Sequence, residues 1–269
     1  MIFSTLIFNT FREAAAKKIF LAFFIISTII ILIFLFLVNV DSVDGIVDML
    51  ETSGAEGVKD LVIGFQVFIF GISYYLVITF CLISVSSFIP SMLEKGNIDL
   101  LLSKPISRSN IIIAKFLGGI LLVFISLTYL LGSVWLILSI KSGFWNFSFL
   151  YAIFGLTLSF AIIFSFTIFI GLISQSTILS ILTSIFLLII CFFLANRETG
   201  IFVLVSNEIA QFILNFLYYV LPKTSDINKI TVDVITNKKV ESYMPVVSSV
   251  LFMLVTLSAS IFYFRKKDY

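Results

Sequence analysis

Residues 142–196 read SGFWNFSFLYAIFGLTLSFAIIFSFTIFIGLISQSTILSILTSIFLLIICFFLAN, and no side chain in this stretch is charged. A helix that crosses a membrane needs about 20 mostly apolar residues, so the stretch is roughly twice as long as one crossing. The chain must therefore fold back within it. Ser174-Gln175-Ser176 is the polar break available near its middle, and we expect a helical hairpin that turns there.

The rest of the chain has the same apolar character. Of its 269 residues, 60% are apolar and 12% are charged, and the mean hydropathy is +1.19. Soluble domains carry roughly 25% charged residues, so the surplus apolar surface must face lipid. The runs lack the alternating pattern of a transmembrane barrel. We predict an all-α integral membrane protein in which residues 1–269 form a single transmembrane domain.

Six apolar runs are long enough to span a membrane. They cover about 19–40, 62–92, 111–140, 148–173, 177–195 and 245–264. No charge lies deep in any run; Lys115 is near one end of the third, where its side chain can reach the headgroups. The first run is too long for a cleavable signal and no small-residue cleavage site follows it.

The distribution of Lys and Arg predicts the orientation, because cytoplasmic loops carry an excess of both. With six spans, ten of these residues lie inside: Arg12, Lys17, Lys18, Lys95, Lys104, Arg108, Lys115, Arg265, Lys266 and Lys267. The other seven lie outside: Lys59, Lys141, Arg197, Lys223, Lys229, Lys238 and Lys239. We therefore expect both termini in the cytoplasm.

Residues 201–221 are long enough for a further span, but they carry a polar stripe. Asn207, Gln211 and Asn215 recur every four residues and fall on one face of a helix. Such a stripe favours an amphipathic helix that lies at the interface or re-enters the membrane over a seventh span. A seventh span would also place the basic tail at 265–267 outside.

The first 18 residues form a second amphipathic pattern. Apolar side chains recur at helical spacing at Ile2, Phe3, Leu6, Ile7, Phe11 and Ala14. We predict an N-terminal interfacial helix along the inner membrane face. The alternative is a frayed, partly ordered terminus.

The loop at 94–108 contains a third short helical pattern. Ile98, Leu101 and Leu102 fall on one face of a helix that Pro105 would end. Ser107 or Ser109 could cap the next helix by accepting a backbone N–H. An apolar stripe on a short helix suits a groove in a soluble partner. The residues alone equally allow an ordinary cytoplasmic loop at the headgroups.

The sequence gives little support for chemistry within this chain. It has no His, and its two cysteines, Cys81 and Cys191, lie in apolar runs. No Gly-x-x-x-x-Gly-Lys-Ser/Thr loop is present to hold a nucleotide phosphate. We therefore expect no catalytic residue, cofactor-binding residue or metal ligand here, and a net charge of +2 does not suggest nucleic-acid binding.

The sequence also bears on three other classes of membrane protein. An ion-coupled secondary transporter usually places ionisable residues inside the membrane, and none lies within these runs. A membrane-embedded enzyme lacks an acid, base or nucleophile pair at membrane depth. A structural or immunity-type membrane protein stays open. Polar residues within the second run, among them Gln66, Tyr74 and Thr79, either face a transport path or satisfy one another.

The 94–108 loop resembles the loop between the second and third helices of the ABC-2 family of ABC transporter permeases. The resemblance rests on Glu94, Gly96, Leu101-Leu102-Ser103-Lys104-Pro105-Ile106-Ser107-Arg108 and Lys115-Phe116-Leu117-Gly118. Tyr218-Tyr219-Val220-Leu221-Pro222 and the ending Phe264-Arg265-Lys266-Lys267-Asp268-Tyr269 are also similar to family members. Asn97 departs from the Thr or Ser common at its position.

This resemblance implies a permease subunit of an exporter in the plasma (inner) membrane of a prokaryote. A separate ATP-binding cassette ATPase would carry ATP-Mg and dock on the loop, as a cytoplasmic coupling helix. A second permease copy or a paralogue would complete the path through the lipid bilayer. The implied coupling residues are Glu94, Gly96, Asp99, Leu101, Leu102, Lys104, Pro105 and Arg108. Of these, Glu94 and Arg108 would brace the loop, while Leu101, Leu102 and Lys104 would face the ATPase.

Overall fold

The computed structural model describes residues 10, 12, 19–37, 54–94, 96, 107–202 and 207–267. These residues form helices and contain no strand, as expected from the composition. The helices are α2 (Ile19–Leu37), α4 (Gly54–Ser86), α5 (Phe88–Met92), α7 (Arg108–Ser142), α8 (Tyr151–Ser174), α9 (Thr177–Ala195), α11 (Glu208–Val220), α12 (Thr224–Ile235) and α13 (Met244–Lys266). A short 3₁₀ turn, η1 (Phe147–Leu150), precedes α8, and a π-helical turn, η2 (Arg197–Ile201), follows α9. The predicted N-terminal interfacial helix lies outside the described residues.

Within the described part of the chain, five segments are long and apolar enough to cross a membrane. They are Lys59–Met92, Arg108–Ser142, Phe147–Ser174, Thr177–Ala195 and Met244–Lys266. These segments overlap the last five predicted runs. In the first run, α2 begins at Ile19 and contributes a shorter apolar helix, Phe23–Ile33. The six-span topology stays a prediction.

The uncharged stretch forms a hairpin at the predicted position. Helix α8 ends at Ser174, and Gln175 adopts a left-handed conformation with φ 53°. The hydroxyl of Ser176 then accepts the backbone N–H of Leu179 at 3.4 Å, which caps the start of α9. A left-handed residue followed by an N-cap reverses the chain in two residues.

The second predicted run is longer than 62–92 and is broken. Helix α4 begins at Gly54 and ends at Ser86, and α5 follows after Ser87. Pro90 explains the break, because a proline cannot donate to the carbonyl four residues earlier and its ring crowds that carbonyl. That carbonyl belongs to Ser86, the last residue of α4.

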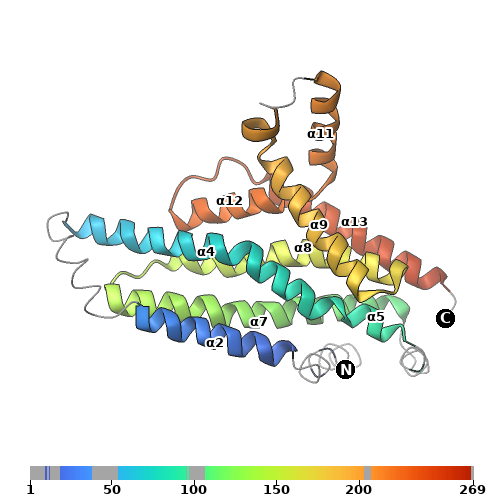
Figure 1. Cartoon of the computed structure of the whole chain (residues 1–269), viewed down its shortest axis with the longest axis horizontal. Coiled ribbons are helices and arrows are strands. Elements are labelled where there is room, and N and C mark those ends of the chain that lie inside the picture. The colour runs from blue at the N-terminus through green and yellow to red at the C-terminus, as the bar shows by residue number, and fades with distance from the viewer. Residues whose placement is uncertain are drawn as a thin grey trace.

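The segment 201–221 does not form one continuous span. Helix α11 covers only 13 residues, about 20 Å at 1.5 Å per residue, which is shorter than a 30 Å hydrocarbon core. None of its residues is buried, and Figure 1 shows it standing away from the long axis of the bundle. Asn207 accepts the N–H of Ile209 at 2.9 Å and thereby caps the helix.

The described helices α2 and α7 run in the same direction. Thr28 hydrogen-bonds to Tyr129 at 3.0 Å, and Lys141 farther along α7 donates to the carbonyl of Leu35 at 3.2 Å. Helix α13 runs the opposite way and ends beside Arg108, the first residue of α7. The start of α2 and the end of α13 therefore point to the same side of the bundle.

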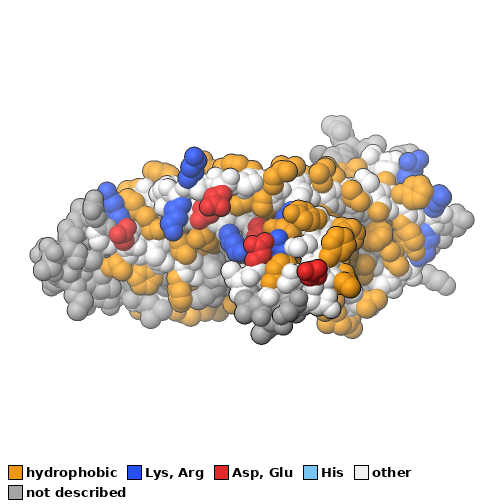
Figure 2. All heavy atoms as spheres, turned by 90° about the horizontal axis from the view of Figure 1, so that it is seen from above, with side chains coloured by type: hydrophobic (Ala, Val, Ile, Leu, Met, Phe, Trp, Pro, Cys, Tyr) orange, Lys and Arg blue, Asp and Glu red, His pale blue; other side chains and the backbone are white. Residues whose placement is uncertain are grey.

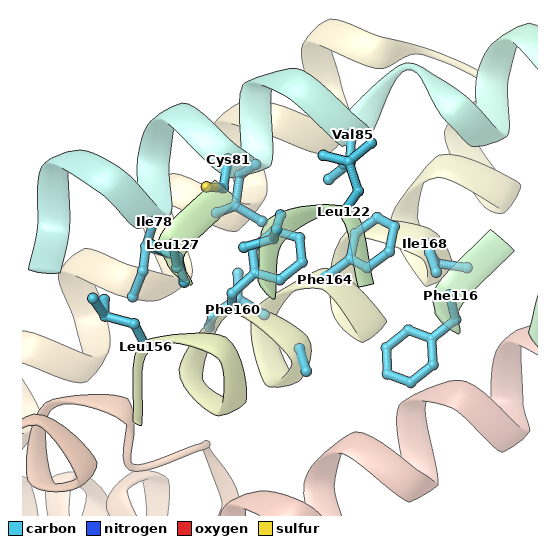
Figure 3. Close-up of a cluster of buried hydrophobic side chains, with 14 of the residues drawn as sticks. Ile78, Cys81, Val85, Phe116, Leu122, Leu127, Leu156, Phe160, Phe164 and Ile168 are labelled. Carbon is cyan, nitrogen blue, oxygen red and sulfur yellow. The ribbon is translucent and has the colours of Figure 1, made fainter. Parts of the chain in front are cut away.

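Helix α8 lies at the centre of the bundle, against α4, α7, α9, α12 and α13. Figure 3 shows apolar side chains from α4, α7 and α8 interlocking along this centre. The labelled residues are Ile78, Cys81, Val85, Phe116, Leu122, Leu127, Leu156, Phe160, Phe164 and Ile168. The core is therefore filled with side chains rather than open along its axis.

Helix α12 was not predicted from the sequence. It lies along the first half of α8, as Figure 1 shows, and also contacts α4 and α9. Gly155 of α8 allows the approach, because a Cβ at that position would lie 2.3 Å from Oγ1 of Thr231 on α12. Thr231 is itself 5% exposed and donates to the carbonyl of Ile227, so it has little freedom to move.

We predict that Gly155→Ala lowers the thermal stability of the purified protein, by about 1–3 kcal/mol of unfolding free energy, because the methyl group overpacks the α8–α12 contact. Gly132→Ala is the matched control, since a Cβ at Gly132 meets nothing within 4 Å. It should leave the melting temperature unchanged or raise it slightly. Equal melting temperatures for the two variants would contradict the observed contact.

Candidate functional site

The predicted coupling loop can be followed only at its two ends. Asp99, Leu101, Leu102, Lys104 and Pro105 lie outside the described residues. The site is therefore built from the segments that lead into and out of the loop.

The chain enters the loop from a buried anchor. Phe88, Ile89 and Met92 of α5 are each 4% exposed or less, and α5 packs against α8. Glu94 follows two residues later and is exposed. Gly96 has a φ of 91°, a left-handed conformation that glycine adopts without strain. The polypeptide chain thus passes from buried to exposed positions within about one helical turn.

The chain returns from the loop at a second anchor, Arg108. Its guanidinium donates to the backbone carbonyl of Phe264 at 3.2 Å and to that of Lys267, both at the end of α13. It also lies 5.9 Å from the centre of the Phe264 ring. The last carbonyls of a helix lack intrahelical donors and carry partial negative charge, so a cation is favourable there. Ser107 caps α7 by accepting from Asn110 N at 3.3 Å.

The Lys115-Phe116-Leu117-Gly118 motif packs just inside this anchor. Lys115 is 9% exposed, and its ammonium lies 5.6 Å from the centre of the Phe88 ring. Phe116 stacks on Phe164 of α8 with ring centres 5.9 Å apart. A Cβ at Gly118 would lie 2.9 Å from Cβ of Thr10. The motif therefore joins α7 to α5, α8 and the N-terminal segment.

The two residues predicted to brace the loop, Glu94 and Arg108, differ in their contacts. Arg108 contacts a neighbouring helix, as its predicted role requires. Glu94 makes no hydrogen bond or ion pair with any described residue. The part that either residue plays in coupling stays a prediction.

Two polar residues, Tyr74 of α4 and Asn146 just ahead of η1, hold α12 in place. Tyr74 is fully buried, and its hydroxyl hydrogen-bonds to Ser159 Oγ at 2.8 Å and to the carbonyl of Thr224 at the start of α12. At the other end, Asn146 donates to Gln66 Oε1 at 2.7 Å and to the carbonyl of Ile235 at 3.2 Å. Gln66 and Tyr74 thus bond to residues of other segments and not to one another, and Nε2 of Gln66 is buried without a hydrogen-bond partner among the described residues.

A pocket of about 310 Å³ opens between α4 and α9. Its lining is almost wholly apolar and consists of Tyr75, Thr79, Ile185, Leu188, Ile189 and Phe192. Its volume is at the lower end of the range of small-molecule sites.

Sequence reasoning also missed two buried cations. Arg197 and Lys223 were counted as outer-loop charges, yet each is only 8% exposed. They meet where α9, α11 and α12 converge, around Tyr218. No local pattern could have revealed this, because the burial depends on segments that meet only in the folded chain.

Comparison with known proteins agrees with this architecture. The family model described as ABC-2 family transporter protein matches residues 5–269. No curated protein and no solved structure matched the chain. Because the family match extends over nearly the whole sequence, including the loop anchors and the α12 segment, this chain belongs to the ABC-2 family of transporter proteins.

Proposed function

We propose that this chain is the membrane-spanning permease of an ABC exporter, driven by a separate ATPase that docks on residues 94–108. Membership of the ABC-2 family over residues 5–269 carries this proposal. Members of this family generally work with an ATP-binding cassette ATPase. In this chain the docking loop would be the helical pattern predicted between α5 and α7.

The anchors at both ends of the loop support its mechanical role. A displacement of the loop would reach α8 through the buried α5. It would reach α13 through Arg108, whose donor atoms hold the last carbonyls of that helix. Because packed helices move as units rather than deforming continuously, such a displacement would shift α5, α7 and α13 together. ATP-Mg would bind and be hydrolysed on the partner subunit.

We infer that the transport path lies between two permease copies, identical or paralogous. A path through one copy would need an open or polar channel along the bundle. The centre formed by α4, α7 and α8 is instead filled by interlocking apolar side chains (Figure 3). A path at the boundary between two copies avoids opening this core.

The proposed orientation places the end of the bundle that carries Arg108 in the cytoplasm. We predict that a single cysteine at Lys238→Cys reacts with an impermeant maleimide in intact cells, whereas one at Lys266→Cys reacts only after permeabilisation. Both positions are exposed. The background carries Cys81→Ala and Cys191→Ala, which remove the buried native thiols. Labelling with the opposite pattern would show that the orientation is inverted.

We predict that Leu101→Asp or Leu102→Asp detaches the ATPase but leaves the permease folded. A carboxylate in a docked apolar stripe loses its water without gaining a partner, which costs several kcal/mol on binding. In the free permease the same carboxylate would remain in water. Co-purification with the ATPase, alongside a melting curve of each permease, measures the two effects separately.

The matched control is Leu122→Asp, which weakens the bundle itself, since Leu122 lies within α7 and is only 4% exposed. It should lower stability, with any loss of the ATPase following from unfolding. If both loop variants still bound the ATPase, the proposal that the ATPase docks on Leu101 and Leu102 would be wrong. Joint loss of stability and binding would instead make the two leucines part of the bundle core.

We predict that Arg108→Ala lowers the melting temperature and reduces ATPase stimulation by the permease. The change leaves carbonyls at the end of α13 without a donor, a cost of about 1–3 kcal/mol. Arg265→Ala is the control, because it removes an exposed cation from the same helix end. Arg108→Lys should restore part of the loss. Indistinguishable behaviour of Arg108→Ala and Arg265→Ala would contradict the anchoring role.

A further inference from the structure

Two cations and one aromatic ring form a buried cluster where α9, α11 and α12 converge. The guanidinium of Arg197 lies 3.6 Å from the centre of the Tyr218 ring, and the ammonium of Lys223 lies 4.6 Å from it. Lys223 also lies 5.1 Å from the centre of the Tyr219 ring. Figure 2 views the molecule from the side on which α11 stands, and charged side chains gather near the middle of this face between apolar surfaces.

The two cations differ in how their hydrogen-bond donors are used. Arg197 donates from Nε to Asn215 at 2.8 Å, from Nη1 to the carbonyl of Leu194 at 3.1 Å and from Nη2 to Glu198 at 3.1 Å. The ammonium of Lys223 has no hydrogen-bond acceptor among the described residues, and solvent reaches it, although the residue as a whole is only 8% exposed. Ring faces attract a cation but do not accept its three N–H groups in the way that an oxygen does.

The carboxylates of the cluster are already engaged. Asp226 accepts the Tyr218 hydroxyl at 2.8 Å and lies 3.6 Å from the ammonium of Lys229. Glu198 is paired with Arg197. Burial lowers the pKa of Lys223, Asp226 raises it and Arg197 lowers it.

The segment that carries Lys223 also borders the apolar pocket between α4 and α9. On one side, the thiol of Cys191 hydrogen-bonds to the carbonyl of Pro222 at 3.0 Å, next to Phe192 in the pocket wall. On the other side, Ser225 hydrogen-bonds to the hydroxyl of Tyr75 at 3.1 Å, and Tyr75 lines the pocket. Residues 222–225 therefore connect the two pocket walls, with Lys223 between the two attachments.

We propose that this junction binds an anionic amphiphile, with a phosphate head on Lys223 beside Arg197 and an acyl chain in the pocket between α4 and α9. The head supplies charged oxygen acceptors to an ammonium that finds none among the described residues. The chain fills a lining that offers almost no polar group. This site is separate from the ATPase-docking loop and does not depend on the proposed coupling.

Native mass spectrometry of the purified chain in detergent tests the site with added phosphatidylglycerol and phosphatidylcholine. We expect wild-type protein to retain the anionic lipid preferentially. Lys223→Gln should weaken that retention about tenfold, the loss of roughly one charge-assisted contact. Lys238→Gln, which removes an exposed lysine from the linker after α12, should change nothing. Lys223→Arg keeps the charge and should keep the preference.

The acyl-chain half of the site is tested by filling the pocket. Ile189→Trp places a larger side chain in the lining and should reduce lipid retention, whereas Phe186→Trp, on an exposed α9 position outside the pocket, should not. Melting curves without lipid should be similar for both variants. Reduced retention in both, or in neither, would remove the pocket from the site.

Dodecyl phosphate, a soluble single-chain anion, distinguishes the source of the ligand. If it competes with phosphatidylglycerol only when Lys223 is present, the site accepts free amphiphiles. If phosphatidylglycerol alone depends on Lys223, the site takes bilayer lipid. Both results support binding of an anionic amphiphile. Equal retention of the anionic and zwitterionic lipids, or retention that is unchanged in Lys223→Gln, would overturn the proposal.

Discussion

Helix α8 can pack against its neighbours only because small or hydroxyl-bearing side chains occupy the positions at which they approach. Gly155 faces α12, Ser159 bonds to α4, and Gly171 lies against α5 and α9. Ser165 bonds to α13 at 2.7 Å, and Thr167 bonds to α9 at 2.8 Å. In apolar surroundings helices associate through close packing and interhelical hydrogen bonds rather than through exclusion of water. The uncharged central helix therefore provides contact geometry that longer side chains would prevent.

The same surroundings explain how α12 is attached. A backbone group without a partner costs several kcal/mol where water is absent, so a helix that ends inside a bundle needs donors and acceptors from other helices. At its start, the backbone N–H of Lys223 donates to Ser249 at 2.8 Å, and Tyr74 holds the carbonyl of Thr224. At its end, Asn146 holds the carbonyl of Ile235. These buried polar side chains fix one position for a helix that is otherwise short.

Hydropathy along the sequence predicted those features that depend only on the residues of one continuous segment. The hairpin at 174–176 and the helices on either side follow from local length, polarity and capping, and their ends agree with the structure to within a few residues. Helix α12 could not be predicted in this way, because 224–235 mixes polar and apolar residues and is buried only by its packing against α4, α8 and α9. The partner of Arg108 was equally hidden, since it lies at the far end of the chain. Both features depend on contacts between segments far apart in the sequence, so a pattern within one segment could not predict them.

Arg108 and Lys223 are two cations at helix ends, and they differ in what accepts their hydrogen bonds. At Arg108, backbone carbonyls accept the guanidinium donors, so the loss of hydration is offset within the chain. At Lys223, ring faces attract the charge, no described residue accepts a hydrogen bond from the ammonium, and solvent reaches it. A neutral side chain of similar length would fill the same space without the cost of desolvating a charge. Packing alone therefore does not require a cation at this position, and the anionic head proposed above is a group that would use its charge.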